Sequence, residues 1–244
     1  MASTALAFGR GDLINIRRDP MFRFLLLAPL VYAALTRFAL PPLTSMLAED
    51  FGFDLVPYHP LILTFFLVLG PTMIIAALGG LLLIEEKDAG TLAAVRVTPA
   101  SLSAFATYRG LAFGGIILAY VVVTMFLSGY VEARMLPAVL AAGLCAAALG
   151  ATIMILMALA SANKLEGLAI VRALGLLVTA LPILPWSVPP PWEYAFGVLP
   201  AYWPAKVYWV AAEGGAYWPH LLIGLLYNGA LLYMLTRAFS RRPQ

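Results

Sequence analysis

The sequence predicts an all-α membrane protein with six transmembrane helices. Hydrophobic residues make up 63% of the 244 positions and the mean hydropathy is +0.93, which leaves too little polar surface for a soluble domain of this size. Crossing a hydrocarbon layer of ~30 Å takes about 20 mostly apolar residues per helix. The apolar stretches do not alternate with period two, which excludes a transmembrane β-barrel. The predicted spans are Phe22–Leu40, Leu61–Ile84, Leu111–Tyr130, Leu136–Ala160, Leu168–Trp186 and Pro219–Thr236.

The basic residues predict the orientation of these spans. With both termini in the cytoplasm, all of the 15 Lys and Arg residues except Arg37, Arg134 and Lys206 lie on the inner side, as the positive-inside rule requires. We therefore expect a multi-pass protein of the plasma (inner) membrane whose partners include lipid. The net charge of +3 is a signal of topology and does not indicate nucleic-acid binding. No cleavable signal peptide is evident.

The segment before the first span predicts a helix that lies in the membrane interface over residues 1–20. Apolar and basic residues alternate there in a way that suits anionic lipid on one side, and a disordered basic tail is the alternative. Asp19 and Pro20 are typical of a helix N-cap and first helical position. The first span is expected to end near Leu40, and Pro41–Pro60 then forms an outer loop that carries acidic residues but no Lys or Arg.

Two features inside the spans concern packing. Gly70–Pro71 in the second span predicts a kink or hinge, since proline removes a backbone donor. The fourth span carries small residues four positions apart, which allows helices to approach closely. We expect this spacing to serve packing within one subunit, with a subunit interface as the alternative. The small residues are Gly143, Ala147 and Ala151 on one row and Ala146 and Gly150 on another.

The segment 187–218, between the fifth and sixth spans, is rich in proline and aromatic residues and carries only Glu193, Lys206 and Glu213 as charges. Amphipathic rings settle at the level of the lipid headgroups. We expect one or two short re-entrant or interfacial helices there on the outer face. The alternative is a long aromatic belt without a specific function.

The residues for several kinds of chemistry are missing. None of the three lysines follows a glycine, so a phosphate-binding loop of the Gly-Lys-Ser/Thr type is excluded. His59 and His220 lie at the outer ends of spans, where two histidines usually mark a polar boundary and not a metal or haem site. Cys145 is expected to pack as a small hydrophobe. We expect no catalytic site, no nucleotide-binding domain and no cofactor bound by this chain, which forms a single transmembrane domain over residues 1–244.

Charge is concentrated in two segments at the predicted inner side. The first, residues 85–100, follows the second span and predicts a short amphipathic helix that ends at Pro99. The second lies at the turn between the fourth and fifth spans. The first segment contains Glu85, Glu86, Lys87, Asp88, Gly90, Thr91, Leu92, Arg96, Thr98 and Pro99, and the second contains Asn163, Lys164, Glu166 and Gly167.

These segments carry a resemblance to a known family. Glu85–Leu92 with Arg96–Pro99, leading to Tyr108–Arg109, resembles the ABC-2 type permeases, the membrane subunits of many bacterial ABC exporters. Asn163–Ala169 with Arg172 is a second match, and Arg18-Asp19-Pro20 is a third. Within that family the overall pattern is similar to the permeases of fluoroquinolone exporters. The resemblance covers nearly the whole chain.

The resemblance implies a mechanism. Family members pair as dimers and bind two ABC ATPase subunits, here separate chains, which use ATP and Mg²⁺. The loop between spans two and three forms a coupling helix that docks into the ATPase, here Glu86–Val97, and the short helices before the last span shape the outer gate. We expect alternating access for a hydrophobic, amphipathic or lipid-like substrate. We also expect Glu86 and Arg96 to face water or the partner, so that reversing either charge leaves folding nearly unchanged.

Other classes of protein stay open at this point. The same loop could recruit a cytoplasmic partner to a membrane scaffold or assembly factor that transports nothing. A membrane-embedded enzyme that modifies lipids is a third possibility. Neither the substrate nor the choice between a homodimer and a heterodimer follows from the sequence.

Overall fold

The prediction of six spans is confirmed. The structure, a computed structural model, describes residues 20–88 and 102–241, and within these ranges all regular elements are helical. Six helices or runs of helices there are long and apolar enough to cross a membrane. The elements are α2 (Pro20–Phe51), η1 (Val56–Tyr58), α3 (His59–Leu63), η2 (Thr64–Leu69), α4 (Gly70–Asp88), α6 (Leu102–Leu127), η3 (Ala133–Met135), α7 (Leu136–Ala160), α8 (Lys164–Gly175), η4 (Leu176–Ala180), α9 (Ile183–Trp186), η5 (Trp192–Val198), α10 (Tyr202–Ala212) and α11 (Trp218–Arg241).

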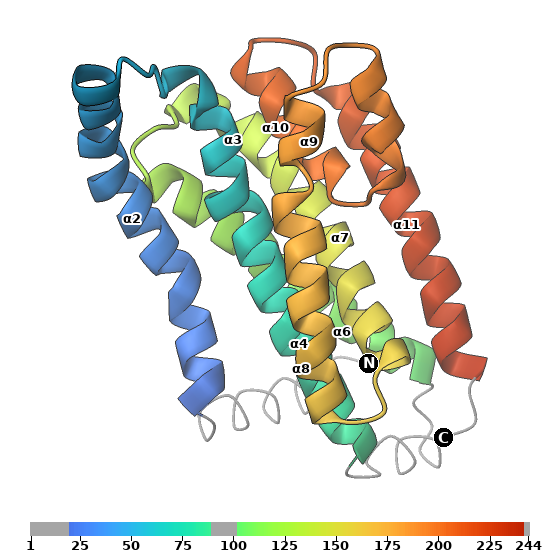
Figure 1. The fold of residues 1–244 in the computed structure, drawn as a ribbon. Coiled ribbons are helices and arrows are strands. Elements are labelled where there is room, and N and C mark those ends of the chain that lie inside the picture. Colours follow the sequence, from blue (N-terminus) through green and yellow to red (C-terminus); the bar gives the residue numbers. More distant parts are fainter. Residues whose placement is uncertain (1–19, 89–101, 242–244) are drawn as a thin grey trace.

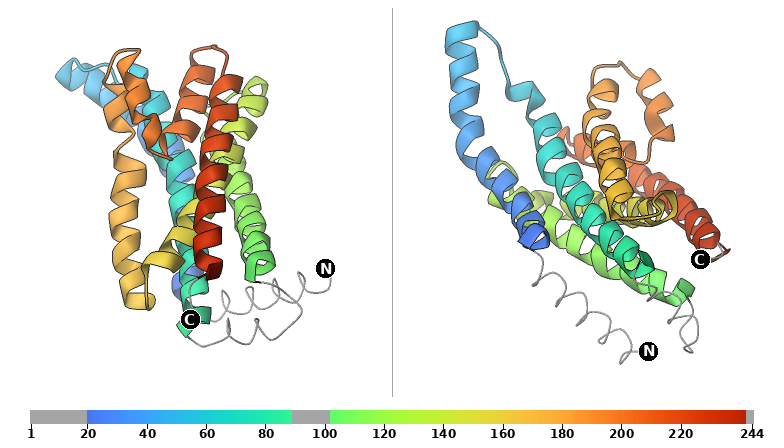
Figure 2. Two further views of the ribbon diagram at one scale, coloured as in Figure 1. Left: turned by 90° about the vertical axis from the view of Figure 1, so that its right-hand side faces the viewer. Right: turned by 60° about the horizontal axis from the view of Figure 1, so that its bottom comes forward.

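The helix α7 lies at the centre of the bundle. It packs against α4, α6, α10 and α11, while α2 and α11 lie at opposite edges (Figure 1). We call the end of the bundle that carries η5 and α10 the aromatic end. The opposite end, where α4 finishes and α6 and α8 begin, is called the motif end; a second view shows the same separation of the two ends (Figure 2).

The first helix is longer than expected. We predicted an outer loop from Pro41 to Pro60, but α2 continues through Pro41 and Pro42 to Phe51, so that prediction is wrong for residues 41–51. Proline lacks a backbone N–H, so it leaves one carbonyl of the helix without its usual donor. A membrane helix can continue through proline when neighbouring groups satisfy that carbonyl. The Thr44 hydroxyl donates to the Leu40 carbonyl at 2.8 Å. The helix α2 is described from Pro20 onward, and both the predicted N-cap Asp19 and the interfacial helix over residues 1–19 lie outside the described residues.

The second span contains a π-helical segment, η2, directly before Gly70–Pro71. In a regular α-helix residue 71 would donate to the Leu67 carbonyl, and proline cannot. That carbonyl instead accepts from the hydroxyl of Thr124 on α6 at 3.3 Å. A Cβ on Gly70 would lie 3.1 Å from a ring carbon of Tyr32, so this glycine lets α2 pass close to the irregular turn.

The aromatic segment forms short helices, as predicted, but its rings do not all lie in a lipid interface. The rings of Tyr202, Trp203, Tyr208 and Trp209 on α10 are buried, and α10 packs against α7 and the second span. An interfacial belt is therefore the wrong description for α10, because its rings fill space between the spans. The exposed Trp192 and Trp218 remain compatible with an interfacial position.

Small residues of α7 pack within the chain. Added Cβ atoms on Gly143 and Gly150 would lie 2.7 and 2.1 Å from side-chain carbons of Leu118 and Ile117 on α6. These two glycines therefore allow α6 and α7 to lie in close contact. Ala147 and Ala151 line an open, apolar recess of about 550 Å³ between α6, α7 and α11.

Candidate functional site

Three helix ends meet at the motif end. Helix α4 finishes at Asp88, α6 begins at Leu102, and α8 begins at Lys164 directly after the end of α7. The two charged segments that the sequence analysis identified are more than 70 positions apart at their ion-paired residues, and the fold brings their described parts into contact. Helices α4 and α8 run side by side toward this end (Figure 1).

Glu86 joins α4 to α6. Its Oε1 lies 2.6 Å from Nη2 of Arg109, whose side chain is only 1% exposed, against 22% for Glu86. A buried guanidinium is tolerated when it is paired. The expectation that Glu86 faces only water or a partner is therefore wrong. Reversing its charge would place two cations together in a site nearly closed to water.

Glu85 joins α4 to α8. Its carboxylate pairs with Lys164, and both side chains are about a third exposed, at 32% and 36%. The Lys164 ammonium also lies 5.3 Å from the centre of the Phe22 ring near the start of α2, within the range of a cation–π contact. One lysine thus contacts two neighbouring helices.

Lys87 joins α4 to the end of α7. Its Nζ donates to the Ser161 carbonyl at 3.0 Å, and Ser161 caps the C-terminus of α7. Successive residues of an α-helix point about 100° apart, so three consecutive charged side chains reach three different sides. In this way residues 85–87 hold α8, α6 and the end of α7 to the last turn of α4. We call these three contacts the clamp.

The second charged segment builds the start of α8. The Asn163 side chain accepts from the Glu166 backbone N–H at 3.0 Å, and the Glu166 carboxylate accepts from the Ala162 N–H at 2.7 Å. This reciprocal arrangement is of the capping-box type, which satisfies donors that the first turn of a helix leaves free. It fixes where α8 begins and therefore where Lys164 lies.

Gly167 brings α8 close to α4. A Cβ there would lie 2.7 Å from Cδ1 of Ile84 and 3.3 Å from Cδ2 of Leu81. No real Cβ contact is as short as the first of these without movement of the neighbour. The glycine is therefore needed for close approach, one turn above the Glu85–Lys164 pair.

Part of the predicted site lies outside the described residues. Gly90, Thr91, Leu92, Arg96, Thr98 and Pro99 fall in residues 89–101, and Asp88 is described only as the last residue of α4. The coupling helix and its docking role therefore stay predictions. Sequence reasoning did not identify Ser161 or Phe22, since a backbone carbonyl and an apolar ring give no signal of such contacts.

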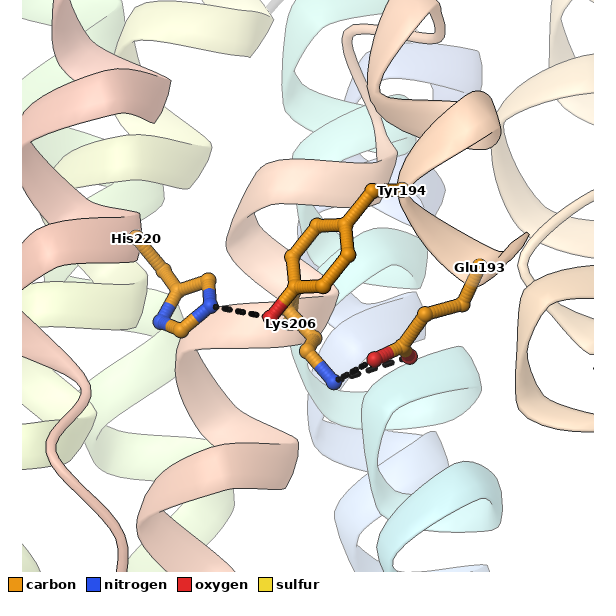
Figure 3. A network of polar contacts seen from close by, with 4 residues as sticks. All are labelled: Glu193, Tyr194, Lys206 and His220. Carbon is orange, nitrogen blue, oxygen red and sulfur yellow. Dashed lines mark hydrogen bonds and ion pairs between the residues drawn. The ribbon is translucent and has the colours of Figure 1, made fainter. Parts of the chain in front are cut away.

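A second polar cluster lies at the aromatic end. The Lys206 ammonium of α10 binds both carboxylate oxygens of Glu193 on η5, at 2.7 and 2.8 Å, and the two side chains are 12% and 8% exposed. The Tyr194 hydroxyl lies 3.3 Å from Nε2 of His220, at the start of α11 (Figure 3). These contacts join η5, α10 and α11. Within the described ranges no group of three or more His, Cys, Asp or Glu residues could hold a metal.

Comparison with known proteins places these features in a family. The family described as "Fluoroquinolones export permease protein Rv2686c-like" matches residues 12–236. Two curated relatives, the fluoroquinolones export permease proteins MT2760 and Rv2686c of Mycobacterium tuberculosis strains CDC 1551 / Oshkosh and ATCC 25618 / H37Rv, are each 45% identical over 237 residues. That alignment covers 97% of this chain and 94% of each relative. No solved structure gives a significant match.

Proposed function

Since this chain belongs to the Rv2686c-like family of fluoroquinolones export permease proteins, we propose that it is the membrane-spanning subunit of an ATP-driven ABC exporter. Two copies would form the transport pathway and work by alternating access, each copy bound to a separate ABC ATPase subunit. The termini and the motif end would face the cytoplasm, in the plasma membrane, as the distribution of basic residues favours.

The observation that carries the proposal is the clamp. A docked ATPase can move the spans only if the docking segment is firmly attached to them. The family resemblance implies a docking helix over Glu86–Val97, and residues 85–87, where this segment begins, bind α6, α7 and α8. A force on that segment would therefore reach four spans together. Movement of this kind is the usual way in which packed helices transmit a switch.

The energy source follows from the composition of the chain. Its lysines are Lys87, Lys164 and Lys206, which follow Glu86, Asn163 and Ala205, so a lysine-bearing phosphate loop does not occur. The proposal therefore assigns ATP and Mg²⁺ to the partner subunit. This chain would supply the pathway and the attachment to the ATPase, without catalysis of its own.

The substrate class rests on the relatives and on the apolar spans. Two relatives are named as fluoroquinolones export permeases, and we propose amphipathic aromatic molecules of this kind as the cargo. The pathway would be closed at the aromatic end by η5 and α10, which the Glu193–Lys206 pair joins there.

Copurification and transport test this function. The chain would be expressed with a candidate ABC ATPase from the same organism, purified as a complex and reconstituted. We expect ATP hydrolysis stimulated by the permease, and ATP-dependent accumulation of a fluoroquinolone in inside-out vesicles. A complex whose ATPase carries a substitution of its catalytic glutamate is the matched control and should bind ATP without accumulation.

The result also separates the rival functions. A membrane scaffold that recruits the same protein would copurify with it but would neither stimulate hydrolysis nor move the drug. Native mass spectrometry of the active complex should show two copies of the permease. Transport by a complex with a single copy would contradict the dimer.

A further inference from the structure

We propose that the two π-helical segments, η2 in the second span and η4 in the fifth, form a paired hinge between the motif end and the aromatic end. The hinge lets the motif-end parts of α4 and α8 swing as one body. Its use in transport rests on the proposed function, whereas the motion itself is a property of the permease alone.

The first support is the placement of the two segments. π-Helical turns are rare, and they usually occur singly and at functional sites. Here η2 covers Thr64–Leu69 and η4 covers Leu176–Ala180, and the two pack against each other. Irregular turns in two neighbouring spans at the same depth provide one place where both helices can bend together.

The second support is the bonding around η2. Pro71 has no N–H for the Leu67 carbonyl, which accepts at 3.3 Å from Thr124 of α6. Sharp bends in helices occur at proline, at π-bulges and where a side chain enters the backbone ladder. All three causes coincide between Thr64 and Pro71, so this part of the second span resists bending less than the regular helix that follows.

The third support is the firm attachment of α4 to α8 on the motif side of the hinge. The Glu85–Lys164 pair joins their ends, and a Cβ on Gly167 would lie 2.7 Å from Cδ1 of Ile84, so the two helices pack closely there. The two helices run side by side from η2 and η4 to the motif end (Figures 1 and 2). They would therefore move together and not past one another.

Trp209 connects the other side of the hinge to the aromatic end. Its indole Nε1 donates to the Thr64 hydroxyl at 2.8 Å, in a buried site at the first residue of η2. Its ring also packs edge-on against Trp186 at 5.1 Å, the last residue of α9, which follows η4 closely in the chain. Trp209 of α10 thus contacts both of the spans that contain the proposed hinge. A swing at the hinge would reach α10 through Trp209.

The experiment measures the motion in the permease alone and then its effect on transport. Cys145 is replaced by Ala, and spin labels are placed at the exposed positions 165 on α8 and 234 on α11, both toward the motif end, since the clamp does not include α11. Electron spin resonance in nanodiscs then gives the distribution of distances between them. We expect a broad distribution, or two populations, for the hinged protein.

Deleting Leu177 removes one exposed residue from η4 and lets the fifth span become a regular α-helix. We expect a single narrow distance distribution and transport reduced about tenfold or more, as loss of a hinge would cause. The matched control, Leu177→Ala, keeps the π-helical segment and should behave like the parent. A folded deletion variant with the parent's distance distribution would overturn the hinge.

Pro71→Ala tests the same idea if the deletion does not fold. It restores a donor to the Leu67 carbonyl and should straighten the second span, which narrows the distribution. Pro41→Ala, at an exposed position inside α2, is its control and should leave the distribution broad. Equal effects of these two substitutions would contradict the proposal.

Trp209→Phe separates motion from transmission. It removes the donor to Thr64, so we expect transport to fall while the 165–234 distance distribution stays that of the parent. Unchanged transport would refute the role of Trp209. If the parent complex shows no ATP-driven transport at all, the proposed function fails, but the distance measurements still decide the hinge.

Discussion

Glu86 binds Arg109 through a 2.6 Å contact between Oε1 and Nη2, at a place where the arginine side chain is 1% exposed. The pair links the last turn of the second span to the third span. A residue that the sequence marks as a docking charge is thus also part of the fold. Its substitution has to be interpreted through stability before it is interpreted through coupling.

Glu86→Gln is expected to destabilise the permease. The change breaks an ion pair whose arginine side chain is 1% exposed, and breaking a buried pair typically costs ~3–5 kcal/mol; Glu86→Lys should cost more. Thermal unfolding of the purified protein, followed by size-exclusion chromatography, measures this. The control is Arg96→Glu, a charge reversal in segment 89–101, which we expect to keep the melting temperature and to lower only the ATPase stimulation. An unchanged melting temperature for Glu86→Lys would contradict the structural role.

Glu85→Gln and Lys164→Gln are expected to have much smaller effects on stability. Both side chains are about a third exposed, and pairs in contact with solvent contribute only ~0–1 kcal/mol. A double-mutant cycle on the melting temperature should therefore give a small coupling. We expect the ATPase stimulation to fall all the same, because the ion pair no longer joins the start of α8 to the last turn of α4. If either variant lost as much stability as Glu86→Gln, solvent exposure would not explain the difference between the two ion pairs.

Gly167→Val is expected to destabilise the contact between α4 and α8. Even a Cβ would lie 2.7 Å from Cδ1 of Ile84, and forcing extra atoms into a packed site costs ~1–3 kcal/mol. Gly167→Ala should cost less, since Ile84 meets it with the end of its side chain. Shortening that side chain with Ile84→Val in the Gly167→Ala background should recover stability. Additive losses in the double variant would rule out this contact as the cause.

Lys206→Met and Glu193→Gln are each expected to destabilise the aromatic end. The two side chains are 12% and 8% exposed, so either single change leaves a poorly solvated charge. The double variant removes both charges and should be more stable than at least one of the single variants. Melting temperatures of the four proteins give the cycle. A double variant less stable than both singles would show that the pair is not buried in the membrane-bound protein.

Labelling of introduced cysteines tests the topology in a Cys145→Ala background. Substitutions at Asp50 and Glu213, which are both exposed near the aromatic end, should react with an impermeant maleimide in intact cells. Substitutions at Asp88 and Lys164 should react only after permeabilisation, because the distribution of basic residues predicts that the motif end is inside. Equal labelling at positions 50 and 88 in intact cells would refute the orientation.

The six spans could be predicted from the sequence because each depends on a local property. A helix in lipid satisfies its backbone hydrogen bonds within itself, so a long enough apolar run is sufficient evidence for it. The short helices before α11 follow from equally local signals. The end of α2 could not be placed in this way, because proline, present here as Pro41 and Pro42, occurs both in loops and inside membrane helices.

The clamp depended on the tertiary structure. The sequence identified Glu85–Lys87 and Asn163–Gly167 as two charged segments, but it did not show that Glu86 pairs with Arg109 while Glu85 pairs with Lys164. Neighbouring residues of a helix point in directions about 100° apart, so the choice is set by how α4, α6 and α8 are rotated against one another. That rotation results from packing at sites such as Gly167 and Ile84, between residues far apart in the chain, and no local pattern encodes it.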